Sequence, residues 1–179
     1  MTRMIAEIRF KKFNQDWKKF VFDTGIHIIY GESGVGKSSL LDAFQGKRLK
    51  DSLNFEMNIS LDPALKVYRI FHNPDHQIIA STVSNEITFA GECKQLDPNQ
   101  LKEILDRNLK YLPDHIDPMM NPGYLSGGEK ELLNLVTALD FNPDILLVDD
   151  GLSFLSDENK VHCLTMMKDW TERSGGIII

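Results

Sequence analysis

A glycine-rich stretch at residues 31–38 constrains the fold of this chain more than any other feature. It reads Gly-Glu-Ser-Gly-Val-Gly-Lys-Ser and lies between an apolar stretch at 26–30 and the start of a helix-like segment at Ser39. A buried strand, a glycine-rich turn and a helix start form, in this order, the setting of a phosphate-binding loop. Glycines let successive N–H groups point inward, and the helix N-terminus adds partial positive charge. The pattern predicts a chain that binds a nucleoside triphosphate.

Each residue type in this stretch has a role in holding a polyphosphate. Lys37 supplies a mobile cation for the outer phosphates, and the Ser38 hydroxyl can bind Mg²⁺. The alternative is a chance glycine-rich turn between a strand and a helix, which eight matching positions in register disfavour. The predicted nucleotide contacts are Gly31, Glu32, Ser33, Gly34, Val35, Gly36, Lys37, Ser38 and Ser39.

Length and charge narrow the class of protein. The 179 residues are enough for one α/β domain with a sizeable core. A formal net charge of −6 argues against a general nucleic-acid surface. No apolar run is long enough to cross a bilayer and no secretory signal opens the sequence, which predicts a soluble cytoplasmic protein. Cys93 and Cys163 lack metal-ligand spacing, so we expect buried free thiols in a reducing compartment.

Strand patterns dominate the first third of the sequence. The stretch 26–30 is apolar on both faces apart from His27, which predicts a central strand that leads into the glycine-rich loop. The helix after the loop is expected to end near Gly46. The other predicted strands span 4–10, 19–22, 55–61 and 67–71, and the first two are expected to pair in antiparallel fashion.

Helices and strands alternate further along. Asp97 is a good N-cap, Pro98 a good first helical residue, and apolar residues recur at helical spacing as far as Leu109. We expect further helices from Ser126 and over 157–173, and strands at 144–149 and 176–179. This alternation predicts a mostly parallel sheet with helices on its faces. Because the sequence ends inside an expected core strand, we expect a shortened version of a longer domain.

A second group of candidate functional residues lies at the start of the helix predicted from Ser126. Ser126 and Glu129 have the spacing of a capping box, which by itself needs no function. Gly127 and Gly128 are costly there, at about 1 kcal/mol each in a helix interior, so something must approach this backbone closely. An anion at the helix N-terminus is the favoured candidate. Further along, the apolar run 145–148 leads into Asp149 and Asp150, a typical place for magnesium-associated carboxylates.

The order of these motifs resembles that of ATP-binding cassette (ABC) ATPases over nearly the whole chain. Residues 31–38 resemble the Walker A motif, 125–129 the family signature and 145–149 Walker B. The resemblance implies a P-loop NTPase fold with an N-terminal antiparallel part and a small helical arm. It also implies a single domain over 1–179, with a nucleotide-binding core at 1–72 and 140–179 and a helical subdomain at about 73–139.

Residues 71–91 resemble a stretch found in energy-coupling-factor ATPases. Those subunits read FQNPDDQ, then a TV dipeptide, an acid and an apolar-Phe-Gly ending, whereas this chain begins Phe-His-Asn-Pro-Asp-His-Gln at Phe71. The resemblance implies a subunit that powers import of a vitamin or transition-metal ion through a membrane partner. Its location would be cytoplasmic and peripheral on the inner face of the cell membrane.

The resemblance also implies a dimer of cassettes that holds ATP and Mg²⁺ between its subunits. Ser38 and Asp149 are then the metal-associated residues, and Phe13 is the candidate for stacking on adenine, with Phe10 and Trp17 as alternatives. The signature residues would reach the γ-phosphate bound by the second subunit: Ser126, Gly127, Gly128 and Glu129.

Several positions depart from the family pattern. His72 stands where a Gln contacts magnesium and water, and Asp150 stands where a Glu polarises the attacking water. Asp is shorter than Glu by about 1.5 Å of reach, and a displacement of about 1 Å can cost roughly a hundredfold in rate. The remaining departures are Gly151 for Pro, Ser156 for Asp, Leu132 for Arg, and a switch His expected beyond Ile179. We therefore expect ATP binding with slow hydrolysis, with His72 and Asp150 as the candidate catalytic residues.

Three functions stay open at this point. The first is an importer ATPase working as a dimer. The second is a degenerate cassette that binds ATP and regulates a competent partner, suggested by His72, Asp150 and Ser156. The third is an ATPase of DNA maintenance, because 125–130 also resembles the signature of that group. Those proteins carry a long coiled coil, and the segment 91–126 shows no sustained heptads, so this function ranks lowest.

Overall fold

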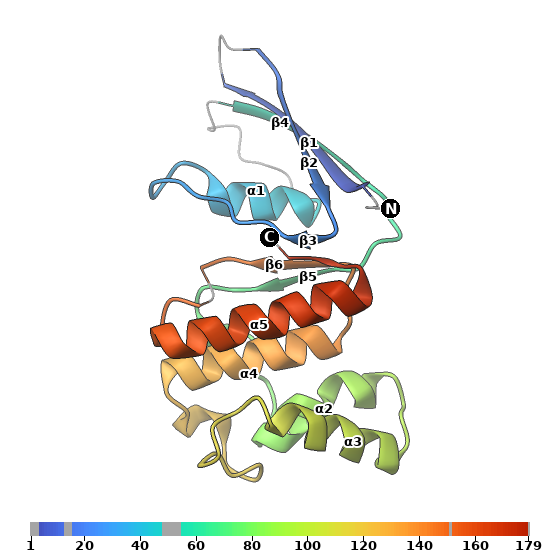
Figure 1. Ribbon diagram of the computed structural model, residues 1–179, viewed down its shortest axis with the longest axis vertical. Helices are drawn as coiled ribbons and strands as arrows, with labels where there is room; N and C mark the ends of the chain where they lie inside the picture. The colour runs from blue at the N-terminus through green and yellow to red at the C-terminus, as the bar shows by residue number, and fades with distance from the viewer. Residues whose placement is uncertain (1–3, 13–15, 48–54, 151, 179) are drawn as a thin grey trace.

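A computed structural model describes residues 4–12, 16–47, 55–150 and 152–178 of the chain. Two sheets and their helices are stacked in layers (Figure 1). One sheet is antiparallel, in the order β2-β1-β4, and the other is parallel, in the order β3-β7-β6-β5. The predicted fold class, a mostly parallel sheet with an N-terminal antiparallel part and a helical arm, is confirmed.

The strands follow the sequence pattern closely except before the glycine-rich loop. The antiparallel pairing expected near the N-terminus is confirmed, since residues 4–10 of β1 pair with residues 18–23 of β2. The strands are β1 (Met4–Lys12), β2 (Lys18–Asp23), β3 (Gly25–Ile26), β4 (Phe55–Leu61), β5 (Val67–Ile70), β6 (Ile145–Val148) and β7 (Ile177–Ile178).

The prediction of a central strand over 26–30 is wrong for the described chain. β3 pairs only with β7, and the ladder ends where the His27 N–H donates to the Ile178 carbonyl at 2.8 Å. Residues 28–30 therefore have no ladder partner on that side among the described residues. Ile28 is 80% exposed and Tyr30 is 98% exposed, so β3 lies at the sheet edge here and leads into an exposed loop.

The helices begin where capping chemistry predicts. Asp97 caps α3 and forms a capping box with Gln100, and Ser126 forms one with Glu129 at the start of α4. α2 was not predicted as a separate helix, although Thr82 caps its first turn. The helices are α1 (Lys37–Phe44), α2 (Val83–Cys93), α3 (Pro98–Leu109), α4 (Gly127–Asp140) and α5 (Asp157–Ser174), with 3₁₀ turns η1 (Pro74–His76) and η2 (Pro122–Tyr124).

Each face of the parallel sheet is covered by a different layer. In β6, Ile145 and Leu147 pack with Leu41 and Phe44 of α1, which fills the space between the two sheets (Figure 1). Leu146 points to the opposite face and packs among residues of α4 and α5. The continuous apolar run of β6 thus provides one face for α1 and the other for α4 and α5.

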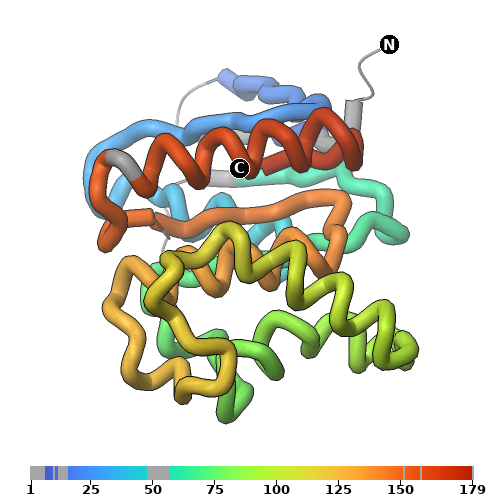
Figure 2. Tube along the Cα trace, turned by 60° about the horizontal axis from the view of Figure 1, so that its bottom comes forward, coloured from blue at the N-terminus to red at the C-terminus, as the bar shows by residue number. Residues whose placement is uncertain are grey.

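α2 and α3 form a separate arm beyond α4 (Figures 1 and 2). Ile87 and Val83 of α2 are fully buried against the same cluster as Leu133 and Leu135 of α4. The predicted boundaries at 72 and 140 stay predictions, because α4 contributes to the core over the sheet as well as to the arm. Within the described residues, no helix combines the length and apolar character needed to cross a membrane.

The two cysteines differ in environment, which corrects one expectation. Cys163 in α5 is buried as predicted, but Cys93, the last residue of α2, is exposed. Burial raises the pKa of the Cys163 thiol to about 11. The thiolate is the reactive form of cysteine. Cys163 should therefore react slowly, because it is buried and because its thiol stays protonated.

We expect a maleimide or iodoacetamide reagent at pH 8 to label Cys93 in the native protein and to leave Cys163 intact. Both thiols should react in urea, because unfolding removes the burial that raises the pKa of Cys163. Mass spectrometry of the labelled peptides reads out both sites, and Cys93→Ser is the matched control. Rapid native labelling of Cys163 would contradict the described packing of α5.

Candidate functional site

The glycine-rich loop connects β3 to α1 and has the backbone shape expected of a phosphate cradle. Gly34 and Gly36 lie in the left-handed region at φ +79° and +107°, which L side chains rarely adopt. A Cβ placed on Gly34 would meet open space, whereas one on Gly31 would meet the Val35 side chain at 3.0 Å. The left-handed glycines and the open space beside Gly34 fit a loop that holds a phosphate group.

Lys37, the first residue of α1, folds back over this loop. Its Nζ donates to the carbonyl oxygens of Gly31 at 2.7 Å and of Glu32 at 3.0 Å. The ammonium group is therefore held at the loop by backbone acceptors rather than by a carboxylate. It is placed where it can exchange those carbonyl oxygens for phosphate oxygens.

The start of α1 is joined directly to the end of β6. The Ser38 hydroxyl donates to Asp149 Oδ1 at 3.0 Å, and the Asp149 N–H donates to the Ile70 carbonyl of β5 at 3.0 Å. These two residues, 111 positions apart in sequence, thus bring a hydroxyl and a carboxylate to one point beside the loop. Such hard oxygen donors fit Mg²⁺, which prefers a few protein oxygens plus phosphate oxygens and water.

A buried arginine completes this part of the site, and the sequence analysis missed it. Arg69 of β5 donates from Nη2 to Asp149 Oδ2 and from Nη1 to Asp42 Oδ1, the second at 2.6 Å. Partial burial would raise the pKa of Asp42, but hydrogen bonds from Arg69 and Lys47 outweigh it and hold that pKa below its usual value. A charged residue within the apolar strand was the available signal, because an arginine is buried only when it is paired.

The two candidate catalytic residues lie next to each other. His72 Nδ1 is 3.6 Å from Asp150 Oδ2, and both side chains are exposed. Asp150 has φ +55°, a left-handed conformation that Asp tolerates better than most residues. The two residues that depart from the family pattern here therefore lie side by side. The centroid of the His72 ring is also 6.2 Å from that of the Phe154 ring.

The segment after β5 is fastened at both ends. Gln77 accepts from the Phe71 N–H at 2.8 Å and donates to the Arg69 carbonyl at 2.7 Å, so it braces the turn rather than reaching the loop at 31–38. The buried Glu86 of α2 accepts from the N–H groups of Ile79 and Ala80 at 3.0 and 2.7 Å. His72 is thus carried on a segment whose shape is fixed by side-chain hydrogen bonds.

The same segment is tied to α4. Lys130 Nζ donates to Asp75 Oδ1 at 2.7 Å, and Asn134 Nδ2 donates to the Pro74 carbonyl at 3.0 Å. The second of these bonds is buried. The segment at 72–76 is therefore bound to the helix that begins at Gly127.

The two glycines of α4, Gly127 and Gly128, lie close to Phe154 of the same chain. A Cβ on Gly127 would lie 3.3 Å from the Phe154 ring, and one on Gly128 would lie 3.0 Å from the Phe154 carbonyl oxygen. Close approach of the loop at 152–155 therefore explains the glycine pair without an anion. The buried Glu131 holds this loop by accepting from the Phe154 N–H at 3.0 Å, and burial raises the pKa of Glu131.

The capping box at the start of α4 is confirmed. Glu129 Oε2 accepts from the Ser126 N–H at 2.6 Å, and the Ser126 hydroxyl accepts from the Glu129 N–H at 3.4 Å. Hydrogen bonding to Ser126, with a further contribution from His115, holds the pKa of Glu129 below its usual value. Glu129 thus bonds to the cap and to His115, and its expected contact with a nucleotide stays a prediction.

The adenine-stacking prediction is not addressed by these contacts. Phe13 lies outside the described residues, as does the side chain of the alternative Phe10. Trp17 is 43% exposed, and Lys11 Nζ lies 5.0 Å from its ring centroid. Phe13 therefore stays a prediction.

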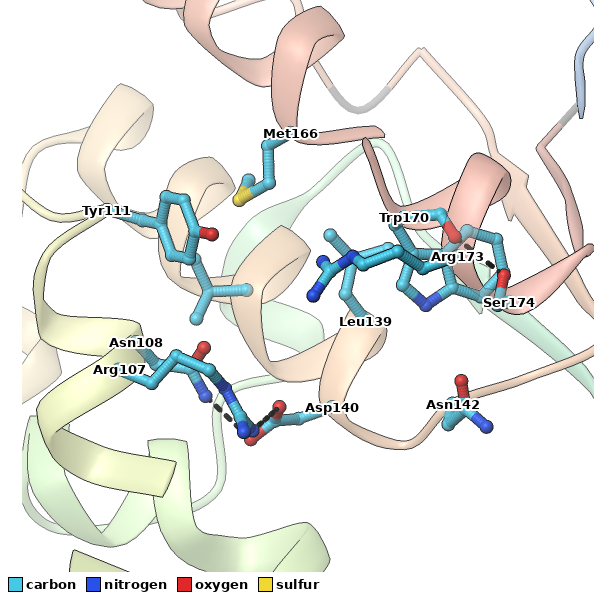
Figure 3. Close-up of a pocket in the computed structure, with 11 residues that line it drawn as sticks. Arg107, Asn108, Tyr111, Leu139, Asp140, Asn142, Met166, Trp170, Arg173 and Ser174 are labelled. Atoms are coloured by element: carbon cyan, nitrogen blue, oxygen red, sulfur yellow. Dashed lines mark hydrogen bonds and ion pairs between the residues drawn. The ribbon is translucent and has the colours of Figure 1, made fainter. Parts of the chain in front are cut away.

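A cavity of about 500 Å³ lies elsewhere, between the ends of α3, α4 and α5 (Figure 3). Arg107 and Asn108 there both donate to Asp140, at 2.8 and 2.6 Å. Basic groups at converging helix C-terminal ends complement the helix dipoles, which accounts for the charges in this cavity. It shares no lining residue with the loop at 31–38.

Comparisons with known proteins point to one family. Residues 21–153 match the ABC transporter family. The energy-coupling factor transporter ATP-binding protein EcfA1 of Streptococcus thermophilus is 25% identical, over 98% of this chain and 68% of its own length. EcfA1 of Streptococcus mutans is 26% identical over 100% of this chain and 70% of its own length. EcfA1 of Mycoplasma capricolum is 32% identical over 79% of this chain, and the match spans 36% of that protein.

A solved structure supports the fold independently. It is described as an ABC transporter ATP-binding protein from Pyrococcus furiosus and superimposes with a TM-score of 0.67, covering 96% of this chain and 90% of its own. Its sequence is 18% identical, so the likeness concerns the fold.

Alanine at the two α4 glycines should separate their roles. We expect Gly128→Ala to lower the free energy of unfolding by about 1 kcal/mol, because its Cβ would press on a backbone oxygen that can move only with the whole loop. Gly127→Ala should be neutral or stabilising by up to about 1 kcal/mol, since the exposed Phe154 ring can move aside and alanine favours helix. Urea denaturation of both variants measures the difference. Equal stabilities for the two variants would contradict the described approach of the loop.

Proposed function

The chain belongs to the ABC transporter family, and we propose that it is an ATP-binding subunit that energises import through a membrane partner. The proposed cargo class is a vitamin or a transition-metal ion, and the proposed working unit is a pair of ATP-binding subunits. The observation that carries this proposal is the loop at 31–38, whose left-handed glycines, folded-back Lys37 and Ser38–Asp149 contact suit a triphosphate.

Binding would use residues that already lie in place. Lys37 would leave the Gly31 and Glu32 carbonyl oxygens and neutralise the outer phosphates. The backbone N–H groups of the loop and the N-terminus of α1 would hold the inner phosphates. Ser38 and Asp149 would hold the associated Mg²⁺, which neutralises charge on the phosphate oxygens when bound.

Cleavage of ATP would depend on His72 and Asp150. Asp150 would act as the base that orients the attacking water, and His72 is positioned 3.6 Å away to hold that carboxylate. Asp150 has a shorter reach than a glutamate has, by about 1.5 Å. We infer a slow ATPase for this reason.

Transmission of ATP binding would use the segment fastened between β5 and α4. Asp75 and Pro74 are bound to Lys130 and Asn134, so a movement at His72 also moves the start of α4. In a pair of subunits, Ser126, Gly127 and Gly128 would approach the nucleotide held by the partner. The proposed place of the protein is the cytoplasmic face of the cell membrane, beside a membrane subunit.

A regulatory role in a heterodimer is the second candidate. The observation that favours it is that two departures from the family pattern, His72 and Asp150, lie together, 3.6 Å apart. In this case the chain would bind ATP and a second, competent subunit would carry out most of the hydrolysis. A DNA-maintenance role receives no support from the described residues, where short helices and turns connect β5 to α4.

Lys37→Ala should weaken ATP binding by at least about tenfold, because it removes the mobile cation of the loop. Isothermal titration calorimetry with a non-hydrolysable ATP analogue measures the affinity. Lys47→Ala is the matched control, because Lys47 follows the opposite, C-terminal end of α1, where it contacts Asp42, and its loss should leave the affinity unchanged. Equal affinities of the Lys37 variant and the parent protein would reject the proposed site.

Asp150→Glu should raise ATP turnover, by roughly tenfold to a hundredfold, because it restores about 1.5 Å of reach toward the water. Asp157→Glu, at the exposed start of α5, is the control and should not change the rate. Steady-state phosphate release decides the matter. If turnover stays at the parent level, Asp150 is not the limiting residue and the regulatory role is favoured.

A further inference from the structure

Arg69 places a fixed positive charge beside the carboxylate that would serve the metal. Its side chain is 6% exposed and comes from β5, between Tyr68 and Ile70. Among the described residues its Nε has no hydrogen-bond partner, so the guanidinium is held through Nη1 and Nη2 alone. The Phe71 ring lies against its other side, with 5.4 Å between the guanidinium carbon and the ring centroid.

The contacts of Arg69 form a closed ring with the start of α1. Ser38 and Asp42 are one helical turn apart and lie on the same face of α1. Ser38 donates to one carboxylate oxygen of Asp149, and Arg69 Nη2 donates to the other. The second amino group of Arg69, Nη1, donates to Asp42. Both oxygens of Asp149 are therefore engaged within the chain.

This arrangement has an electrostatic consequence for a metal ion at Ser38. A guanidinium is always charged, and its planar fork pairs tightly with carboxylates. It neutralises the charge of Asp149 that would otherwise attract Mg²⁺ and orient its water.

We infer that Arg69 is a specificity-determining residue that makes nucleotide binding at this site depend only weakly on Mg²⁺. The inference rests on the proposed function, since it concerns the same nucleotide site. Arg69 acts here through Asp149 and by its charge, and we assign it no part in bond cleavage.

A purely structural role for Arg69 makes a different prediction. If Arg69 only fastens α1 to the sheet, replacing it weakens nucleotide binding to the same extent with and without Mg²⁺. If its charge competes with the metal, replacing it changes the ratio of the two affinities. The ratio therefore separates the two roles even when the variant is less stable.

The test measures the affinity for a fluorescent ATP analogue in Mg²⁺ and in EDTA. For the parent protein we expect Mg²⁺ to improve the affinity by only a few-fold. In Arg69→Met the improvement should be larger by about tenfold, the effect of removing one unit charge near a partly exposed site. Arg69→Gln, which keeps a hydrogen-bond donor but removes the charge, should behave as Arg69→Met does and decides the test if the methionine variant does not fold.

Asp42→Asn is the matched control. It removes one arm of the ring and leaves Arg69 on Asp149, so the ratio of affinities should not exceed that of the parent protein. The same ratio in the parent protein and both Arg69 variants would overturn the inference and leave the nucleotide site intact. Absence of binding by the parent protein in both conditions would instead overturn the proposed function, and this inference with it.

Discussion

The hydrogen bond from Ser38 to Asp149 joins the two parts of the chain on which the site depends. Ser38 lies in the first turn of α1, directly after the glycine-rich loop, and Asp149 lies at the end of the buried strand β6. The packing of Leu41 and Phe44 between the sheets and the bond from Arg69 to Asp42 anchor α1 as well. Through this contact Ser38, at the end of the loop, and Arg69 of β5 bond to the same carboxylate of Asp149.

A second set of polar contacts extends this arrangement toward the arm. Gln77 and Glu86 shape the segment after β5, and Lys130 and Asn134 fasten it to α4. Glu131 then fastens α4 to the loop at 152–155, which follows Asp149 in sequence. These contacts link the segment after β5, the helix α4 and the loop at 152–155 into one connected set of residues around the site.

The sequence predicted those parts of the fold that rest on local chemistry. Caps at Asp97 and Ser126, and the apolar run of β6, identify their elements without tertiary information. The strand predicted over 26–30 was wrong because apolar residues alone do not form a strand. A neighbouring strand must pair with them, and among the described residues β7 pairs with β3 only at Gly25 and Ile26. Arg69 and Asp42 could not be paired from sequence, since their contact exists only when β5 lies beside α1.

The central claim is that the backbone of residues 31–38 holds the phosphates of a nucleotide. The most direct measurement is a crystal structure of the protein with a non-hydrolysable ATP analogue. The account predicts phosphates within the curve of the loop, with Lys37 Nζ on phosphate oxygens instead of the Gly31 and Glu32 carbonyl oxygens. A nucleotide bound elsewhere, with Lys37 still on those carbonyl oxygens, would contradict it.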